Sequence, residues 1–115
     1  MNLKIETGDL FNFKYIETMK PVHCISADAR MGAGIAVKMN KWFKLEGLRS
    51  KVLKVGRCYY WNGVFNLITK LHYYDKPLYC NLTSSLVDLK ELIHKFNVKK
   101  LVMPLIGCGL DKLRK

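Results

Sequence analysis

Residues 22 to 37 read VHCISADARMGAGIAV, and their pattern gives the clearest indication of the fold class. Its first five residues are a short run of strand-forming types that follows a proline and meets turn formers, as a buried strand does. A glycine-containing loop, residues 28 to 34, comes next. Ile35, Met39 and Trp42 then recur at spacings of four and three, which predicts a helix to about residue 43. The stretch is therefore a strand, a glycine loop and a helix in direct succession.

The rest of the chain continues this alternation of strands and helices. Residues 2 to 6 predict a first short strand, and residues 101 to 103 predict a last one that runs into a second glycine loop. Residues 57 to 61 and 64 to 69 flank Asn-Gly, the strongest short hairpin signal. Apolar residues at spacings of four or three predict an amphipathic helix from Pro77 to about Asn97. Together these elements predict one three-layer α/β domain over residues 1 to 115, whose ligands bind at the carboxyl ends of the strands.

Composition excludes several classes of protein. The chain has 115 residues, 50% of them hydrophobic and 25% charged, so it is not disordered and leaves no room for a second domain. No apolar stretch approaches the roughly 20 residues of a membrane helix, and the start MNLKIETGDL lacks the apolar core of a secretion signal. We therefore expect no membrane partner and a location in the cytoplasm, the nucleus or both.

The cysteines and histidines predict neither a metal centre nor a cofactor. The four cysteines form no CxxC pair and lie inside or beside apolar runs, which favours buried thiols over zinc ligands or a disulfide framework. The three histidines share neither a helix face nor a ligand spacing.

The charge balance indicates a partner that carries phosphate. The chain has 20 Lys and Arg against 9 Asp and Glu, a net charge of +11. A nucleic acid or a small phosphorylated ligand fits this excess, although solubility alone explains it about as well. One basic stretch, opposed only by Glu46, would track phosphates if its members shared a face: Lys38, Lys41, Lys44, Arg49, Lys51, Lys54 and Arg57. A solvated helix and loop is the plainer interpretation of this basic stretch.

Two of the candidate binding features are the glycine loops. Residues 26 to 34 lie between a strand and a helix, where glycines let backbone N–H groups approach an anion and the helix start adds a positive dipole end. Residues 107 to 111 follow another strand with the same permissive backbone. Two facing loops supply hydrogen-bond donors on both sides of a diphosphate without a metal. Each loop on its own is also typical of a tight turn.

The other two candidates are charged side chains at strand ends. Asp9 follows the first strand, where a carboxylate accepts a hydrogen bond from an exocyclic amine such as that of adenine. Lys70 ends a strand, and a partly desolvated lysine can lose its proton and attack a sugar carbon. Taken singly, Asp9 is more typical of a turn and Lys70 of a solvated strand end.

Four ordered motifs together resemble the macrodomain family. They are Gly8-Asp9-Leu10-Phe11, the run from His23 to Val37, Leu67-Ile68-Thr69-Lys70, and Pro104 to Asp111. The resemblance extends from about Leu3 to Leu113 and points to the branch of terminal ADP-ribose protein glycohydrolases, also described as O-acyl-ADP-ribose deacylases. It implies a mixed central sheet flanked by helices. Relatives continue after Asp111 with a further helix and strand, which this sequence, ending at Lys115, lacks, so we expect an uncovered sheet face and an unpaired strand edge.

The resemblance also implies an ADP-ribose pocket. Asp9 and Leu10 would meet the adenine, and two groups would hold the diphosphate and the distal ribose: Ser26, Arg30, Met31, Gly32, Ala33, Gly34 and Ile35 in the first loop, and Ile106, Gly107, Cys108, Gly109 and Leu110 in the second. Lys70 would attack the anomeric carbon of the distal ribose and displace a glutamate carboxylate of a modified protein, while Asp111 would shuttle protons. The same pocket would present an acyl ester on the distal ribose for hydrolysis.

Three functions remain open at this point. The leading hypothesis is a hydrolase that releases ADP-ribose from modified glutamate side chains or deacylates O-acyl-ADP-ribose, with ADP-ribose or an ADP-ribosylated protein as its partner. The second is a module that binds ADP-ribose without cleaving it. The third is a basic nucleic-acid-binding protein.

Overall fold

The computed structural model describes residues 3–12, 14–15, 18–31, 35–72, 75–76 and 78–104, with the backbone alone at residues 12 and 35. Strands and helices alternate as the sequence predicts. Their order is β1 (Lys4–Thr7), the 3₁₀ helix η1 (Leu10–Asn12), β2 (Met19–Ser26), α1 (Ile35–Phe43), the 3₁₀ helix η2 (Glu46–Ser50), β3 (Cys58–Trp61), β4 (Val64–Lys70), α2 (Tyr79–Phe96) and β5 (Lys100–Met103).

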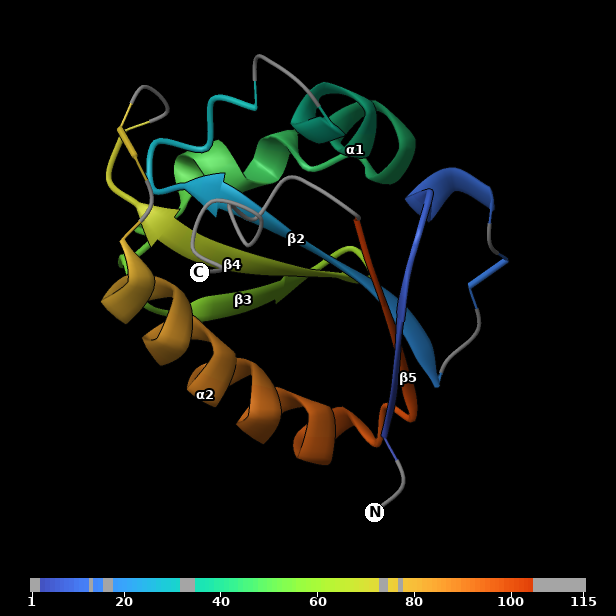
Figure 1. Cartoon of the computed structure of the whole chain (residues 1–115). Helices are drawn as coiled ribbons and strands as arrows, with labels where there is room; N and C mark the ends of the chain where they lie inside the picture. Colours follow the sequence, from blue (N-terminus) through green and yellow to red (C-terminus); the bar gives the residue numbers. More distant parts are fainter. Residues whose placement is uncertain are drawn as a thin grey trace.

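The strands form one sheet in the order β1-β5-β2-β4-β3 (Figure 1). β1, β5, β2 and β4 are mutually parallel, and β3 runs antiparallel to β4, which confirms the expected mixed sheet. The strand ends are staggered, because β1 and β5 end level with Val22 and Phe65, whereas β2 and β4 continue four and five residues further. Parallel strands all point the same way, so these carboxyl ends still form one edge of the sheet. We call this the carboxyl edge.

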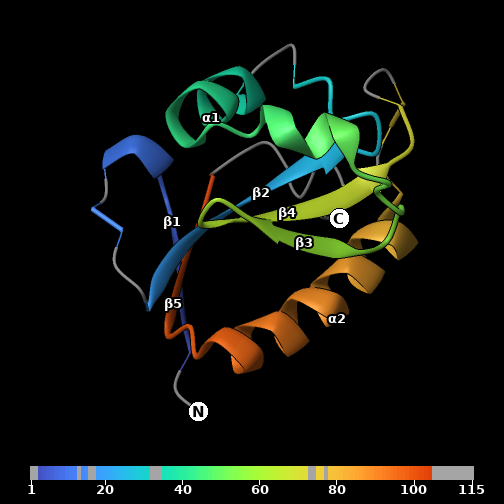
Figure 2. The same ribbon diagram turned by 180° about the vertical axis from the view of Figure 1, so that it is seen from behind.

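Helices lie on both faces of the sheet, which confirms the predicted three layers (Figures 1 and 2). The expectation of an uncovered face is therefore wrong for β2 and β4, most of whose residues are buried on both faces. One face packs against α1 and η2 through a buried cluster that includes Ile25, Met39, Leu48 and Ile68. The other face packs against α2 through Phe65, Leu67, Leu82 and Leu89. β2 and β4 lie in the interior of the sheet, so most of their residues are buried on both faces.

The hairpin between β3 and β4 turns at the predicted Asn62-Gly63. Their φ angles of 49° and 81° belong to the left-handed region that the tight two-residue turn requires. The Asn62 side-chain amide also donates a hydrogen bond to the carbonyl oxygen of Lys44, at 2.8 Å. The turn therefore fastens the hairpin to the end of α1.

α2 ends as predicted at Asn97, whose φ of 54° is the left-handed conformation that stops a helix. Its start is Tyr79, and Pro77 lies outside the described residues. The helix is fastened to β3 by Asp88, whose Oδ2 accepts hydrogen bonds from Arg57 Nε at 3.1 Å and from the Cys58 amide at 2.8 Å. Neither α1 nor α2 is apolar and long enough to cross a membrane.

The cysteines depart from the expected set of buried thiols. Cys58 is buried and free, as expected. Cys80 is exposed, because it occupies the solvent side of the first turn of α2. Cys24, on β2, takes part in a disulfide, so the expectation of a buried thiol is wrong for this residue.

A buried polar pair joins the two central strands. His23 on β2 and Asn66 on β4 are direct partners in the parallel register, and His23 Nε2 lies 2.6 Å from Asn66 Oδ1. The Asn66 amide nitrogen donates to the carbonyl oxygens of Tyr59 and Val64, so its Oδ1 faces the imidazole as an acceptor. Nε2 therefore carries the proton, and Nδ1 remains buried without a partner. Burial lowers the pKa of His23 to about 4, although the hydrogen bond to Asn66 opposes the shift.

We predict that this pair makes stability depend on pH. Between pH 6.5 and about 4 the unfolded chain binds a proton at His23 and the folded chain does not, so the free energy of unfolding falls as the pH is lowered through that window. The full contribution, converted from the pKa difference, is roughly 3 kcal/mol. Urea unfolding at several pH values measures the slope.

The His23→Leu variant serves as the comparison. It should be less stable than the parent at neutral pH, because Asn66 Oδ1 loses its donor. Between pH 6.5 and 4, however, its stability should fall less steeply than that of the parent. Equal slopes for the two proteins would show that His23 titrates normally in the folded state.

Candidate functional site

Three of the sequence motifs that are predicted to bind a ligand lie at the carboxyl edge. Asp9 follows β1, and the Gly8 amide donates to the carbonyl oxygen of Met103 at 3.0 Å, which joins the ends of β1 and β5. The first glycine loop follows β2, and Lys70 is the last residue of β4. Since the strand order is β1-β5-β2-β4, the ends of β5 and β2 lie between Asp9 and Lys70.

Lys70 and the first loop are joined through the backbone. Ser26 and Lys70 are partners in the parallel register, and the Ala27 amide donates to the Lys70 carbonyl oxygen at 2.9 Å. The register shifts by one residue just before this point, from Ile25 opposite Ile68 to Ser26 opposite Lys70. Such an irregularity bends a strand and redirects the side chains that follow it. The predicted nucleophile and the start of the predicted diphosphate loop are thus held as one unit.

Asp28 organises the beginning of the loop. Its Oδ1 accepts a hydrogen bond from the buried Ser26 hydroxyl and another from the Arg30 amide at 3.2 Å. A carboxylate that binds the amide two residues later forms a turn of its own, which is typical of Asp. The Ser26 side chain is therefore engaged within the loop.

The loop backbone adopts a strained conformation after Asp28. Ala29 and Met31 have φ angles of 51° and 47°, in the left-handed region that residues with a Cβ avoid at a cost of about 1 kcal/mol or more each. Ala29 is fully buried and Met31 is 6% exposed, and both pack into the core beneath α1. The Met31 side chain is therefore not available to a ligand, whereas Arg30 between them is exposed.

At the other end of the edge, Asp9 is exposed and Leu10 is fully buried. Asp9 Oδ1 accepts a hydrogen bond from the Phe11 amide at 3.0 Å, which holds the carboxylate beside the strand end. The Tyr15 hydroxyl donates to the Leu10 carbonyl oxygen at 2.6 Å. Burial raises the pKa of Tyr15 to about 12, with a smaller contribution from the Asp9 carboxylate, so this donor stays protonated. Of Asp9 and Leu10, Asp9 is the residue that faces solvent.

Comparison with known proteins identifies the family. The bovine (Bos taurus) ADP-ribose glycohydrolase OARD1 is 42% identical over 117 residues, which cover 93% of this chain and 72% of that protein, and the human protein is 41% identical over the same shares. The chain belongs to the macrodomain family, in the branch that contains OARD1. Among family models, no match was found.

Solved structures agree with the macrodomain fold. The macrodomain of Mycobacterium tuberculosis DarG superposes with a TM-score of 0.76 over 94% of this chain and 80% of that chain, at 20% identity. Thermosipho africanus DarTG, solved in complex with ADP-ribose, superposes with a TM-score of 0.70 over 95% of this chain and 35% of that chain, also at 20% identity. At this identity the likeness concerns the fold alone.

Several residues that the macrodomain resemblance assigned to the site lie outside the described residues. They are Gly32, Ala33 and Gly34 in the first loop, and Ile106, Gly107, Cys108, Gly109, Leu110 and the predicted acid-base Asp111 in the second. Their roles stay predictions. Ile35 is the first residue of α1, so the first loop leads directly into a helix start, as expected.

The structure adds two residues to this macrodomain site that the sequence did not single out. Asp28 is one. The sequence does carry a signal for it, because Asp commonly forms a turn by accepting a hydrogen bond from the backbone amide two residues later. Arg49, on η2, is the other: its Nε donates to the Ala29 carbonyl oxygen at 3.0 Å, and Nη2 donates to the Arg30 carbonyl oxygen at 2.6 Å. No local pattern predicts Arg49, since it contacts the loop from about 20 residues away.

The basic stretch is only partly available to a phosphate-bearing partner. Arg49 binds the loop and Arg57 pairs with Asp88. The ammonium groups of Lys38 and Lys51 lie over aromatic rings, at 5.4 Å from the Phe11 centroid and 4.4 Å from the Trp61 centroid. Contacts within the chain thus occupy a majority of the predicted phosphate-tracking side chains, which weakens the nucleic-acid hypothesis.

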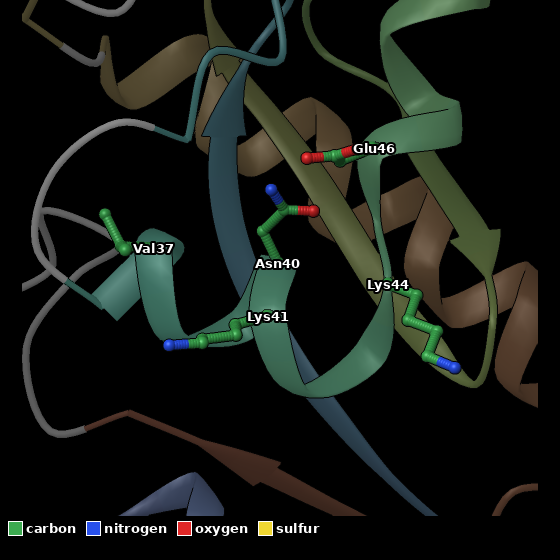
Figure 3. A pocket seen from close by; sticks show the side chains of 5 residues that line it. All are labelled: Val37, Asn40, Lys41, Lys44 and Glu46. Atoms are coloured by element: carbon green, nitrogen blue, oxygen red, sulfur yellow. The ribbon is translucent and has the colours of Figure 1, made fainter.

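A surface pocket of about 520 Å³ lies against α1 (Figure 3). Its lining is Val37, Asn40, Lys41, Lys44 and Glu46, none of which belongs to the predicted site. Lys41 and Lys44 extend in opposite directions in Figure 3, so their ammonium groups do not converge on one anion. In the part of the chain that the structure describes, no cluster of His, Cys, Asp and Glu side chains forms a metal site.

We predict that removing the Asp28 carboxylate loosens the first loop. In Asp28→Ala, the buried Ser26 hydroxyl and the Arg30 amide lose their acceptor, which should cost on the order of 1 kcal/mol of stability. Asp28→Asn keeps an oxygen acceptor and should lose less. Thermal unfolding compares the three proteins, and equal midpoints for Asp28→Ala and the parent would contradict this role.

Proposed function

We propose that this macrodomain binds ADP-ribose along the carboxyl edge and hydrolyses the bond between its distal ribose and a glutamate side chain of a modified protein. The alternative substrate for the same pocket is O-acyl-ADP-ribose, whose ester would be cleaved. One observation carries the proposal: in a chain 42% identical to an ADP-ribose glycohydrolase, Asp9, the first loop and Lys70 all occur at the carboxyl ends of parallel strands of one sheet.

The edge favours an elongated ligand. β1 is three strand spacings from β4, about 14 Å at the usual separation of neighbouring strands, and Lys70 lies five residues, roughly 16 Å, further along β4 than the level at which β1 ends. A ligand that meets both Asp9 and Lys70 must therefore have two distant recognition groups. Adenine at Asp9 and a second ribose at Lys70, joined by a diphosphate over the ends of β5 and β2, satisfy this requirement. The ADP-ribose held by the structurally similar DarTG supports the choice of ligand.

The diphosphate would bind at the first loop. The loop joins β2 to the start of α1, where backbone N–H groups and the positive end of the helix dipole attract an anion. Arg30 is exposed on the same loop and carries the charge that would pair with a phosphate.

Lys70 would act on the distal ribose. As a neutral amine it attacks the anomeric carbon, forming a C–N bond while the C–O bond to the glutamate breaks and the carboxylate departs. Asp111 accepts the proton that the amine loses and then passes a proton from water as the C–N bond is hydrolysed. ADP-ribose leaves, and Lys70 recovers its amine. The register of β2 and β4, which sets Lys70 opposite Ser26, keeps this amine beside the loop that holds the diphosphate.

We predict saturable binding of ADP-ribose to the folded chain. Isothermal calorimetry measures it, after circular dichroism and gel filtration have shown that the chain is folded and monodisperse. Asp9→Ala should weaken binding, because the carboxylate is the expected partner of the adenine amine. A folded chain that gives no heat with ADP-ribose would exclude both the hydrolase and the simple binding module.

We predict that Lys70→Ala abolishes turnover and keeps ADP-ribose binding. With the nucleophile removed, release of ADP-ribose from a glutamate-modified protein should fall by more than about a hundredfold. Lys76→Ala is the matched control, since it removes an exposed lysine a few residues away. Lys70→Ala that cleaves at the parental rate would rule out the covalent mechanism. Running O-acetyl-ADP-ribose alongside the modified protein decides which of the two substrates the parent cleaves.

A further inference from the structure

The guanidinium of Arg49 donates hydrogen bonds to two consecutive carbonyl groups of the first loop. Nε donates to Ala29 at 3.0 Å, and Nη2 donates to Arg30 at 2.6 Å. The guanidinium is planar and its donors are fixed in a fork, so two bonds define the position of both carbonyls together. The carbonyls that it holds belong to the segment where the backbone is left-handed at Ala29 and at Met31.

The segment that carries Arg49 is anchored in the core. Arg49 lies on η2, and η2 is anchored in the core by Leu48 and by the preceding Leu45, both fully buried. Trp61 on β3 packs on the adjacent Gly47 so closely that an added Cβ would lie 2.7 Å from the indole ring. Arg49 is therefore fixed to the body of the domain, and the loop is fixed to Arg49.

Holding the carbonyls also directs the amides of the loop. In a trans peptide the C=O and the following N–H point in opposite directions. With the Arg30 carbonyl bound to Arg49, the Met31 amide points to the other side of the loop, away from the guanidinium. This amide precedes the glycines that lead into α1, where the proposed diphosphate binds.

We propose that Arg49 is a positioning residue that holds the first glycine loop in the conformation that receives the diphosphate. The inference rests on the proposed function for the identity of the ligand. The two hydrogen bonds from Arg49 to the loop, which we call the brace, do not depend on that ligand. Arg49 acts through the loop carbonyls and not as a charge on the ligand. Without these two hydrogen bonds, Ala29 and Met31 can leave their left-handed backbone conformations, and a smaller share of molecules has the loop in the conformation that binds the ligand. Affinity falls in proportion to that share.

Three variants distinguish the effect of the two hydrogen bonds to the loop from the effect of the positive charge. Arg49→Gln removes the fork and one positive charge, and Arg49→Lys keeps the charge but loses the planar fork. Lys54→Gln is the control that removes an equal charge from the neighbouring segment, since Lys54 is exposed and its backbone is hydrogen-bonded to Tyr59 and Arg57. Calorimetry with ADP-ribose is run on each at about 50 and about 500 mM salt, which changes the screening of charges several-fold.

We expect both Arg49 variants to bind ADP-ribose about tenfold more weakly than the parent, as when the competent share of molecules falls to about a tenth. The ratio to the parent should be the same at both salt concentrations, because the brace is a local contact. Lys54→Gln should bind like the parent. Arg49→Lys that binds like the parent, or a loss in Arg49→Gln that disappears at high salt, would overturn the proposal in favour of simple charge attraction.

A second measurement needs no ligand. Hydrogen exchange of the backbone amides, followed by NMR in the apo proteins, should be faster in Arg49→Gln than in the parent at residues 29 to 31 and unchanged in β2 and α2. Unchanged exchange in the loop would overturn the brace. If the parent itself fails to bind ADP-ribose, the proposed function fails, and this exchange comparison still decides the role of Arg49.

Discussion

The hydrogen bond between His23 and Asn66 fixes how the two central strands pair, and the rest of the site depends on that pairing. The two residues are register partners inside the sheet, with Nε2 and Oδ1 at 2.6 Å and no access to water. Any slip of β2 along β4 would leave both polar groups buried and unpaired, at a cost of a few kcal/mol. Apolar neighbours such as Ile25 and Ile68 tolerate other partners, so this polar pair specifies the register. Ser26 then falls opposite Lys70, and the loop meets the lysine.

Much of this arrangement can be predicted from the sequence, because it rests on local patterns. Apolar periodicity indicates α1 and α2, and Asn62-Gly63 determines the hairpin, since few residues other than Asn and Gly adopt its left-handed angles. Runs that are apolar on both faces indicate central parallel strands, whose carboxyl ends must share an edge. That Asp9, the first loop and Lys70 all occur at the carboxyl ends of parallel strands follows from topology alone, whereas the stagger between the ends of β1 and β4 depends on the register.

What the sequence does not predict are contacts between distant residues. His23 and Asn66 are 43 positions apart, and Arg49 reaches Ala29 across 20. In the sequence, Arg49 is one of seven basic residues in a stretch that suggests a phosphate-tracking surface, and nothing local distinguishes it from Lys51 or Lys54. Only the packing of η2 through Leu48 brings its guanidinium to the loop. Likewise, Leu10 and Met31 match the family motif, but the fold turns their side chains into the core.

The strained backbone of the first loop explains why the loop needs contacts from other parts of the chain. Its residues at 29 and 31 are Ala and Met, and their burial beneath α1 holds them in a backbone conformation that their Cβ atoms disfavour. Glycine would relieve the strain but would remove the side chains that anchor the loop to the core. Asp28 fixes the start of the loop and Arg49 fixes its middle, so the strain is balanced by hydrogen bonds and by packing at once. Residues 28 to 31 are thus held in place by contacts within the chain, so that binding a diphosphate there costs less conformational entropy.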